Sequence, residues 1–147
     1  MGPKIFHVGD VGCGNIVKLA NNMIGLACSS ATAEGFALGV KAGIDPQVLY
    51  DILKVSTSNN WTLQQYPNTV LKRNFAPGFK VSLAYKDIHL ALDMGKENGV
   101  PMACGNLVKT DLEAAMASGY SDKDVNVVLL NLEKAGGLKV ETKNRNK

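Results

Sequence analysis

The sequence has few of the residues that build disulfide, zinc or membrane-spanning sites. Its 147 residues include three cysteines and two histidines, without CxxC or His-x-x-Cys spacing. An odd number of isolated cysteines indicates reduced thiols and a cytoplasmic compartment. Two isolated histidines do not make a zinc-ligand set. We also find no signal peptide and no apolar run that we expect to span a bilayer. The sequence therefore predicts a cytoplasmic protein without a metal site and without membrane contact.

A dense basic surface is missing as well. The formal net charge is +3, and four basic residues lie in the C-terminal stretch 139–147. Basic side chains do not alternate with aromatic ones, so we do not expect a nucleic acid partner. The basic stretch is typical of a solvated chain end. The content of 46% hydrophobic and 20% charged residues is normal for a globular domain.

Helical patterns follow one another along most of the chain. An extended segment at 4–8 leads through a glycine-rich turn into the run 15–43, which is apolar on more than one side. A helix with apolar residues almost all round is usually buried, so we expect it to be central. Further helical runs are expected at 45–56, 79–99, 104–119 and 122–137, with short helices and loops between 57 and 78. The sequence therefore predicts an all-α, multi-helix domain with a long central first helix and a short extended N-terminal segment.

The glycine-rich turn, residues 9–14, reads GDVGCG. A dinucleotide fingerprint needs G-x-G-x-x-G inside a strand–helix–strand unit, whereas these glycines are spaced G-x-x-G-x-G. Read from Gly12, the third glycine position is Val17, and no second strand follows. This disfavours a phosphate cradle. Two interpretations remain open, a flexible connection and a turn that delivers an active-site helix.

A polar stripe supports the second interpretation. Five residues recur at three- and four-residue spacing and share one helix face: Asn15, Lys18, Asn22, Gly25 and Ser29. The lysine either extends to solvent or points into a polar cavity. Asn22 supplies a donor and an acceptor one turn from the amine. The pair suits a small substrate with polar oxygen atoms.

The later helix carries a carboxylate on an apolar face. We expect that face to consist of Leu83, Ala84, Asp87, Leu90, Ala91 and Met94, with Lys86 on the solvent side. A buried aspartate needs a partner. Asp87 is therefore either tied to a helix end or an arginine, or it is an active-site wall that pairs with Lys18.

Two further features have both a structural and a functional interpretation. Ser121 and Asp124 are spaced like a capping box and predict the start of the last helix. Trp61 and Tyr66 lie in the polar segment, where an aromatic side chain either fixes a loop to the core or lines a ligand pocket.

Together these residues resemble the β-hydroxyacid dehydrogenase family, which includes 3-hydroxyisobutyrate dehydrogenases, tartronate semialdehyde reductases and glyoxylate/succinic semialdehyde reductases. The family signature G-x-x-G-x-G-x-x-x-K-x-x-N-N matches Gly9, Gly12, Gly14, Lys18, Asn21 and Asn22. Phe79, Lys86 and Asp87 occupy matching places in the later helix, and AEGFALGVKAGIDPQVL and Trp61 also fit. The resemblance implies a helical bundle like the C-terminal domain of 6-phosphogluconate dehydrogenase.

The resemblance also implies roles for individual residues. Lys18 would be the catalytic lysine that exchanges a proton with the substrate oxygen, and Asn22 would orient the substrate. The remaining substrate-binding residues would be Trp61, Tyr66, Phe79 and Asp87. Lys86 would reach toward the cofactor, NAD or NADP. The reaction would be hydride transfer between the nicotinamide and a small 3-hydroxy acid of the 3-hydroxyisobutyrate, tartronate semialdehyde or 2-hydroxymethylglutarate type.

Members of that family begin with a Rossmann domain that binds the cofactor. The resemblance implies that residues 1–14 are the end of such a domain and its linker. Residues 15–138 would be the helical substrate-binding and dimerisation domain, and 139–147 the basic tail. Such a chain alone would be inactive, and its partners would be a Rossmann domain and a second copy. Two other hypotheses are a non-catalytic helical scaffold for oligomerisation and a small stand-alone nucleotide-binding protein.

Overall fold

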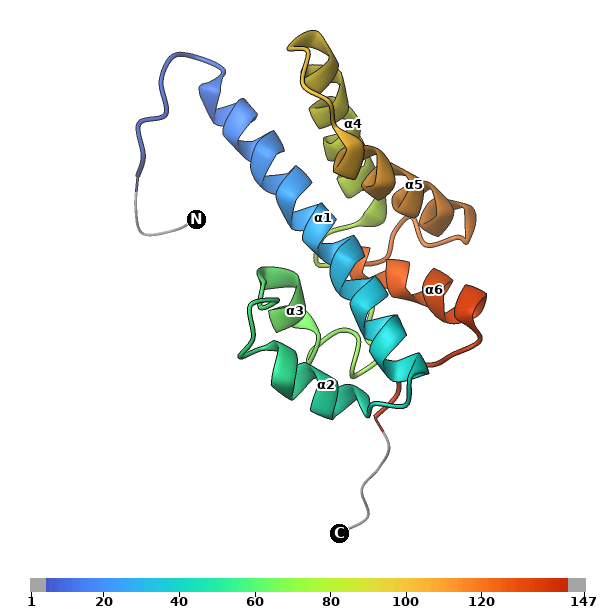
Figure 1. Ribbon diagram of the computed structural model, residues 1–147. Coiled ribbons are helices and arrows are strands. Elements are labelled where there is room, and N and C mark those ends of the chain that lie inside the picture. Colours follow the sequence, from blue (N-terminus) through green and yellow to red (C-terminus); the bar gives the residue numbers. More distant parts are fainter. Residues whose placement is uncertain (1–4, 143–147) are drawn as a thin grey trace.

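The computed structural model describes residues 5–142, which form helices and no β-strand (Figure 1). The elements are α1 (Cys13–Lys41), α2 (Pro46–Leu53), α3 (Trp61–Gln65), α4 (Val81–Glu97), α5 (Ala103–Ala117), the 3-10 helix η1 (Val125–Val127) and α6 (Val128–Gly136). Residues 5–8 have no regular structure, in agreement with a short non-helical entry segment. The predicted all-α fold is confirmed.

Helix α1 is the axis of the bundle. It contacts α2, α3, α4, α5 and α6, and Figure 1 shows it running diagonally between α2 and α3 on one side and α4, α5 and α6 on the other. Its buried residues all come from its second half: Leu26, Ser29, Ala33, Phe36 and Ala37. The prediction of a central first helix is therefore confirmed for this half.

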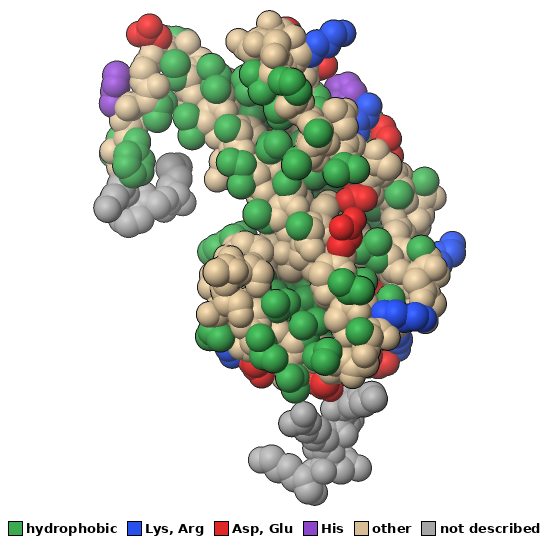
Figure 2. Space-filling model, viewed as in Figure 1, with side chains coloured by type: hydrophobic (Ala, Val, Ile, Leu, Met, Phe, Trp, Pro, Cys, Tyr) green, Lys and Arg blue, Asp and Glu red, His purple; other side chains and the backbone are tan. Residues whose placement is uncertain are grey.

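The first half of α1 extends beyond the bundle. Ile16, Val17 and Ile24 are each more than half exposed. Figure 2 shows hydrophobic side chains spread over this part of the molecule. An apolar surface of this kind marks a place where another protein surface packs.

Helix α1 is also long and apolar enough to cross a bilayer, judged by length and composition alone. The sequence expectation that no such run exists is therefore wrong. The core helix of a globular protein passes the same test, and α1 packs against all the other α-helices. We interpret α1 as a core helix.

Most helix ends follow the chemistry read from the sequence. Asp45 Oδ1 accepts hydrogen bonds from the backbone N–H groups of Gln47 and Val48, at 2.9 and 3.2 Å, and so caps α2. Gly99 and Gly119 follow α4 and α5 with φ of 67° and 82°, which a glycine adopts without steric cost. The last helix differs. Asp124, not Ser121, caps it, by accepting from the Asn126 N–H at 3.0 Å, so the predicted capping box is wrong.

The buried face of α4 also differs from the sequence pattern. Leu83 and Leu90 are 48% and 47% exposed, although both were expected to face the core. The residues that α4 buries are Val81, Ala84, Asp87, Ile88, Ala91 and Gly95. Helix α4 packs against both α1 and α5, and these two neighbours rotate its buried surface toward Ile88. Asp87 remains buried in either arrangement.

The segment after α6 is anchored to the core. Glu133 accepts hydrogen bonds from both guanidinium nitrogens of Arg73 and from the Val140 N–H at 2.7 Å. Val140 is fully buried. The prediction of a solvated tail is therefore wrong for residues 139–142, and its remainder, 143–147, lies outside the described residues.

Candidate functional site

Lys18, Asn22 and Asp87 form one hydrogen-bonded cluster. Lys18 Nζ lies 2.9 and 3.0 Å from the two carboxylate oxygens of Asp87. Asn22 Nδ2 donates to Asp87 Oδ2 at 2.7 Å. The predicted pairing of Lys18 with Asp87 is confirmed. The catalytic and binding roles of the three residues stay predictions.

Local helix geometry explains why these groups meet. Lys18 and Asn22 are four residues apart on α1, so their side chains lie one above the other on the same face. Asp87 is on the buried face of α4, which packs against α1, and it is only 4% exposed. A carboxylate buried in this way needs donors, and α1 supplies two.

The cluster carries more positive than negative charge. Burial opposes ionisation of Asp87, but the hydrogen bonds from Lys18 and Asn22 outweigh it and hold the pKa of this carboxyl below its ordinary value. Lys86 Nζ lies 4.0 Å from the same carboxylate. The side chains of Lys18 and Lys86 are 54% and 62% exposed. Two accessible ammonium groups around one carboxylate attract an anionic ligand.

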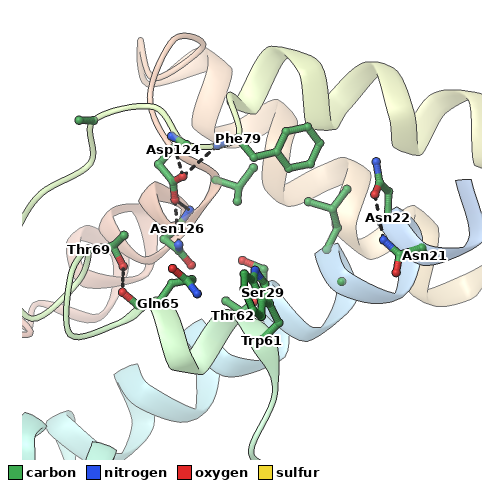
Figure 3. A pocket seen from close by; sticks show the side chains of 15 residues that line it. Asn21, Asn22, Ser29, Trp61, Thr62, Gln65, Thr69, Phe79, Asp124 and Asn126 are labelled. Carbon is green, nitrogen blue, oxygen red and sulfur yellow. Dashed lines mark hydrogen bonds between the residues drawn. The ribbon is translucent and has the colours of Figure 1, made fainter. Parts of the chain in front are cut away.

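A cavity of about 410 Å³ begins beside this cluster. Three of the predicted substrate-binding residues line it, namely Asn22, Trp61 and Phe79. Lys18 and Asp87 are not among its lining residues, so Asn22 is the link between the cluster and the cavity. Figure 3 shows Asn21 and Asn22 at one end of the cavity and Asn126, Gln65 and Thr69 at the other.

Asp124 fixes the wall of the cavity opposite α1. Its Oδ2 accepts from the N–H groups of Gly78 and Phe79, at 3.2 and 3.1 Å. Its Oδ1 accepts from the N–H and the side-chain Nδ2 of Asn126, at 3.0 and 2.8 Å. These four bonds join the loop that carries Phe79 to helix η1, and so they set the distance between Phe79 and the rest of the cavity (Figure 3).

The prediction that Tyr66 lines the pocket is wrong. Its side chain is 1% exposed and packs edge-on against Phe36, with 4.7 Å between the ring centroids. Burial raises the pKa of the Tyr66 hydroxyl well above its ordinary value. The ring belongs to the hydrophobic core because α3 folds back against the buried half of α1.

Four polar residues of the cavity were not expected as site residues: Ser29, Thr62, Gln65 and Asn126. Ser29 lies on the polar stripe of α1, and this pattern was the signal that could have identified it. The other three come from α3 and η1 and have no distinguishing spacing in the sequence. Their position follows from tertiary packing alone.

The described residues, 5–142, contain no group of three His, Cys, Asp or Glu side chains arranged for a metal ion. The chemistry available at the cluster is that of an amine held by a carboxylate and an amide. Such an amine can give a proton to an oxygen atom or accept one from it. The amide and the apolar walls of the cavity can orient a ligand beside it.

Comparison with known proteins finds a match over most of the chain. Residues 12–132 match the family model described as NAD-binding of NADP-dependent 3-hydroxyisobutyrate dehydrogenase. The matched range includes Lys18, Asn22, Lys86 and Asp87.

Curated relatives and solved structures agree with this match. The chain is 34% identical over 142 residues to the 2-(hydroxymethyl)glutarate dehydrogenase of Eubacterium barkeri, covering 95% of this chain and 47% of that protein. It is 43% identical over 99 residues to the 3-hydroxyisobutyrate dehydrogenase of Pseudomonas aeruginosa, covering 63% of this chain and 33% of that protein. A crystal structure of 3-hydroxyisobutyrate dehydrogenase from Salmonella typhimurium superimposes with a TM-score of 0.83 at 25% identity, covering 87% of this chain and 45% of that one. The chain thus spans half or less of the length of these proteins.

Proposed function

The chain belongs to the family of NAD(P)-dependent 3-hydroxyisobutyrate dehydrogenases, and on this premise we propose that Lys18 is the proton-transfer residue for the interconversion of a 3-hydroxy acid and its carbonyl form. The observation that carries the proposal is the Lys18–Asn22–Asp87 cluster. It places an accessible amine at the mouth of a cavity, with its other side held by a buried carboxylate.

Each residue of the cluster has one task in this reaction. In the reducing direction the Lys18 ammonium donates a proton to the carbonyl oxygen of the substrate, which becomes the hydroxyl. In the oxidising direction the Lys18 amine accepts that hydroxyl proton. Asp87 holds the lysine in place and stabilises its charged form. Asn22 Nδ2 is occupied by Asp87, so its Oδ1 is the atom that faces a substrate donor.

The described residues fit only one end of a nicotinamide cofactor. The cofactor supplies the hydride chemistry. Lys86 has an ammonium that is 62% exposed and 4.0 Å from its nearest carboxylate, so it has donors available for a polar group of the cofactor. Residues 5–142 contain no strand–helix–strand unit for the adenosine and pyrophosphate. In our proposal a Rossmann domain binds that part, with the substrate between the two domains.

The substrate class in this proposal is a small carboxylate with a hydroxyl on its third carbon. The named activities of the relatives, on 3-hydroxyisobutyrate and 2-(hydroxymethyl)glutarate, support this class. The excess positive charge of Lys18 and Lys86 supports a negatively charged ligand. The exposed apolar residues on the first half of α1 support a further packing partner, either the Rossmann domain or a second copy of the chain.

The test is an activity assay of Lys18→Met in the chain joined to any coding sequence that precedes it in its gene. Oxidation of 3-hydroxyisobutyrate and 2-(hydroxymethyl)glutarate is followed with NAD⁺ and with NADP⁺. Loss of positioned acid–base catalysis lowers turnover by about 10²–10⁴-fold. Turnover close to that of the unsubstituted protein would exclude a catalytic Lys18 and favour the scaffold alternative.

Lys54→Met is the matched control. Lys54 also donates to an aspartate, Asp51 Oδ1 at 2.6 Å, but both partners lie on the surface of α2 and its C-terminal end. This substitution removes a lysine–aspartate pair without touching the cavity. We expect it to leave turnover unchanged.

A further inference from the structure

The cavity continues well beyond the Lys18 cluster and ends in polar groups. Leu26, Phe79 and Val125 form apolar lining. Polar lining is provided by Ser29, Thr62, Gln65 and Asn126, which we call the polar end. Figure 3 shows that Asn126 and Gln65 lie at the end remote from Asn22. The lining therefore changes from polar to apolar to polar along the cavity.

Two buried atoms at the polar end have no hydrogen-bond partner within the described residues. These are Ser29 Oγ and Asn126 Oδ1, and each residue is only 5% exposed. A buried polar atom without a partner costs free energy, so such atoms are rare in native proteins. Their position in a cavity wall indicates that a ligand group completes them.

The geometry determines which kind of group this is. Asn126 Nδ2 donates to the carboxylate of Asp124 at 2.8 Å, and so the amide cannot be flipped without placing two oxygens together. Asn126 Oδ1 is therefore a fixed acceptor, and it requires an N–H or O–H donor. No Lys, Arg or His lines the cavity, and the Asp124 carboxylate lies directly behind Asn126. An anionic group is therefore disfavoured at this end.

The distance along α1 sets the length of the ligand. Ser29 is seven residues after Asn22 on the same helix face, which corresponds to about 10 Å. The about seven carbon–carbon bonds between C3 and C10 of a ten-carbon acid, each roughly 1.5 Å long, reach almost this far. A four-carbon hydroxy acid held at Asn22 does not.

We infer that the polar end is a second substrate subsite, which binds an uncharged hydroxyl or carboxamide at the far end of an elongated 3-hydroxy acid. This inference rests on the proposed function, because it takes the reacting hydroxyl to lie at Lys18. The apolar middle of the cavity contacts the carbon chain. The polar end selects acids with a terminal donor over acids with a terminal methyl group.

Gly25 makes the inference testable without removing a polar group. It lines the cavity between Asn22 and Ser29, and a Cβ added there meets no atom within 4 Å. Gly25→Leu therefore fits the helix and places its side chain in the cavity. Gly35→Leu is the matched control, since Gly35 is an exposed glycine of the same helix, has the same free space, and does not line the cavity.

The experiment is calorimetric titration of the chain with 3,10-dihydroxydecanoate and with 3-hydroxydecanoate. We expect the dihydroxy acid to bind about tenfold more tightly, which is the effect of one to two completed hydrogen bonds. Ser29→Ala reduces this preference, and Gly25→Leu abolishes it. Gly35→Leu leaves it unchanged.

Equal affinity for the two acids, or no measurable binding of either, would overturn the inference. A preference that survives Gly25→Leu would also overturn it, because the terminal hydroxyl would then be bound elsewhere. The titration involves no redox step, so its outcome is separate from the turnover of Lys18→Met. If that turnover is lost and the two acids bind equally, the proposed function stands and the second subsite does not.

Discussion

Two buried carboxylates, Asp87 and Glu133, each join distant parts of the chain through a cation, and they do so differently. Glu133 receives both guanidinium nitrogens of Arg73 and the Val140 N–H, and the arginine is 30% exposed. Asp87 receives Lys18 and Asn22, and the lysine is 54% exposed. Arginine keeps its proton under all ordinary conditions, whereas a lysine amine can release one. The first pair is suited to hold structure and the second to transfer protons.

The largest expected effect comes from making the two pairs alike. Lys18→Arg keeps the positive charge beside Asp87 but removes an amine that can release a proton. We expect turnover to fall by about 10²–10⁴-fold while stability changes little. Assay of turnover together with thermal unfolding measures both quantities.

The reverse exchange, Arg73→Lys, is the control for that experiment. It replaces a two-pronged hydrogen bond with a single charged group at Glu133, far from the cavity. Turnover should be retained. A fall in turnover for both exchanges would mean that the two pairs do not differ in function.

The second effect is on stability at the Glu133 pair. Arg73→Leu leaves the Glu133 carboxylate, which is 8% exposed, without a cation. Removal of one partner from a buried pair costs about 3–5 kcal/mol, and we expect about 3 kcal/mol for this partly exposed arginine. Urea-induced unfolding followed by circular dichroism measures the loss.

Lys80→Leu is the comparison for Arg73→Leu. The Lys80–Asp122 pair is on the surface, with side chains 43% and 82% exposed. A surface pair contributes about 0–1 kcal/mol. A similar loss for both substitutions would show that burial of Glu133 is not what makes its arginine important.

The smallest effect is the dependence of stability on acid. The pKa of Asp87 is lower in the folded protein than its ordinary value, so the folded state holds this proton less tightly than the unfolded state. The resulting stabilisation is present above about pH 4 and is lost as the pH falls through the lowered pKa. Asp87→Asn should therefore show a smaller decrease in unfolding temperature between pH 6 and pH 3 than the unsubstituted protein, within a range of about those values.

Asp51→Asn serves as the comparison in the acid titration. The pKa of Asp51 is also lowered, chiefly by its hydrogen bond from Lys54, but this pair is on the surface. Solvent screens such a pair, so the acid dependence should change less than for Asp87→Asn. An identical change would mean that the buried cluster contributes nothing particular to acid stability.

The parts of the molecule that follow from local spacing were predictable from the sequence. Lys18 and Asn22 are neighbours because four residues make one helical turn, and Asp45 caps α2 because its side chain reaches the next N–H groups. The polarity of Asp87 within an apolar pattern predicted a partner, and the structure supplies one.

The failures have a common physical cause, which is packing between segments distant in the sequence. Tyr66 lies in a polar stretch, yet Phe36 from another helix draws its ring into the core. The exposed positions of Leu83 and Leu90 depend on where α5 lies against α4. Thr62 and Asn126 have no pattern of their own, and only the fold brings them to one cavity.

Helix α1 has a mechanical consequence for the proposed reaction. Its base is held by the bundle from Leu26 onward, and Lys18 stands eight residues earlier, about 12 Å out along a rigid rod. A tilt of the rod by about 5° moves the amine by roughly 1 Å, a displacement large enough to cost about 10²-fold in rate. The Lys18–Asp87 bond ties the rod to α4 and limits this swing. The ion pair is thus also a brace, and whatever packs against Ile16 and Val17 holds the same lever from its other side.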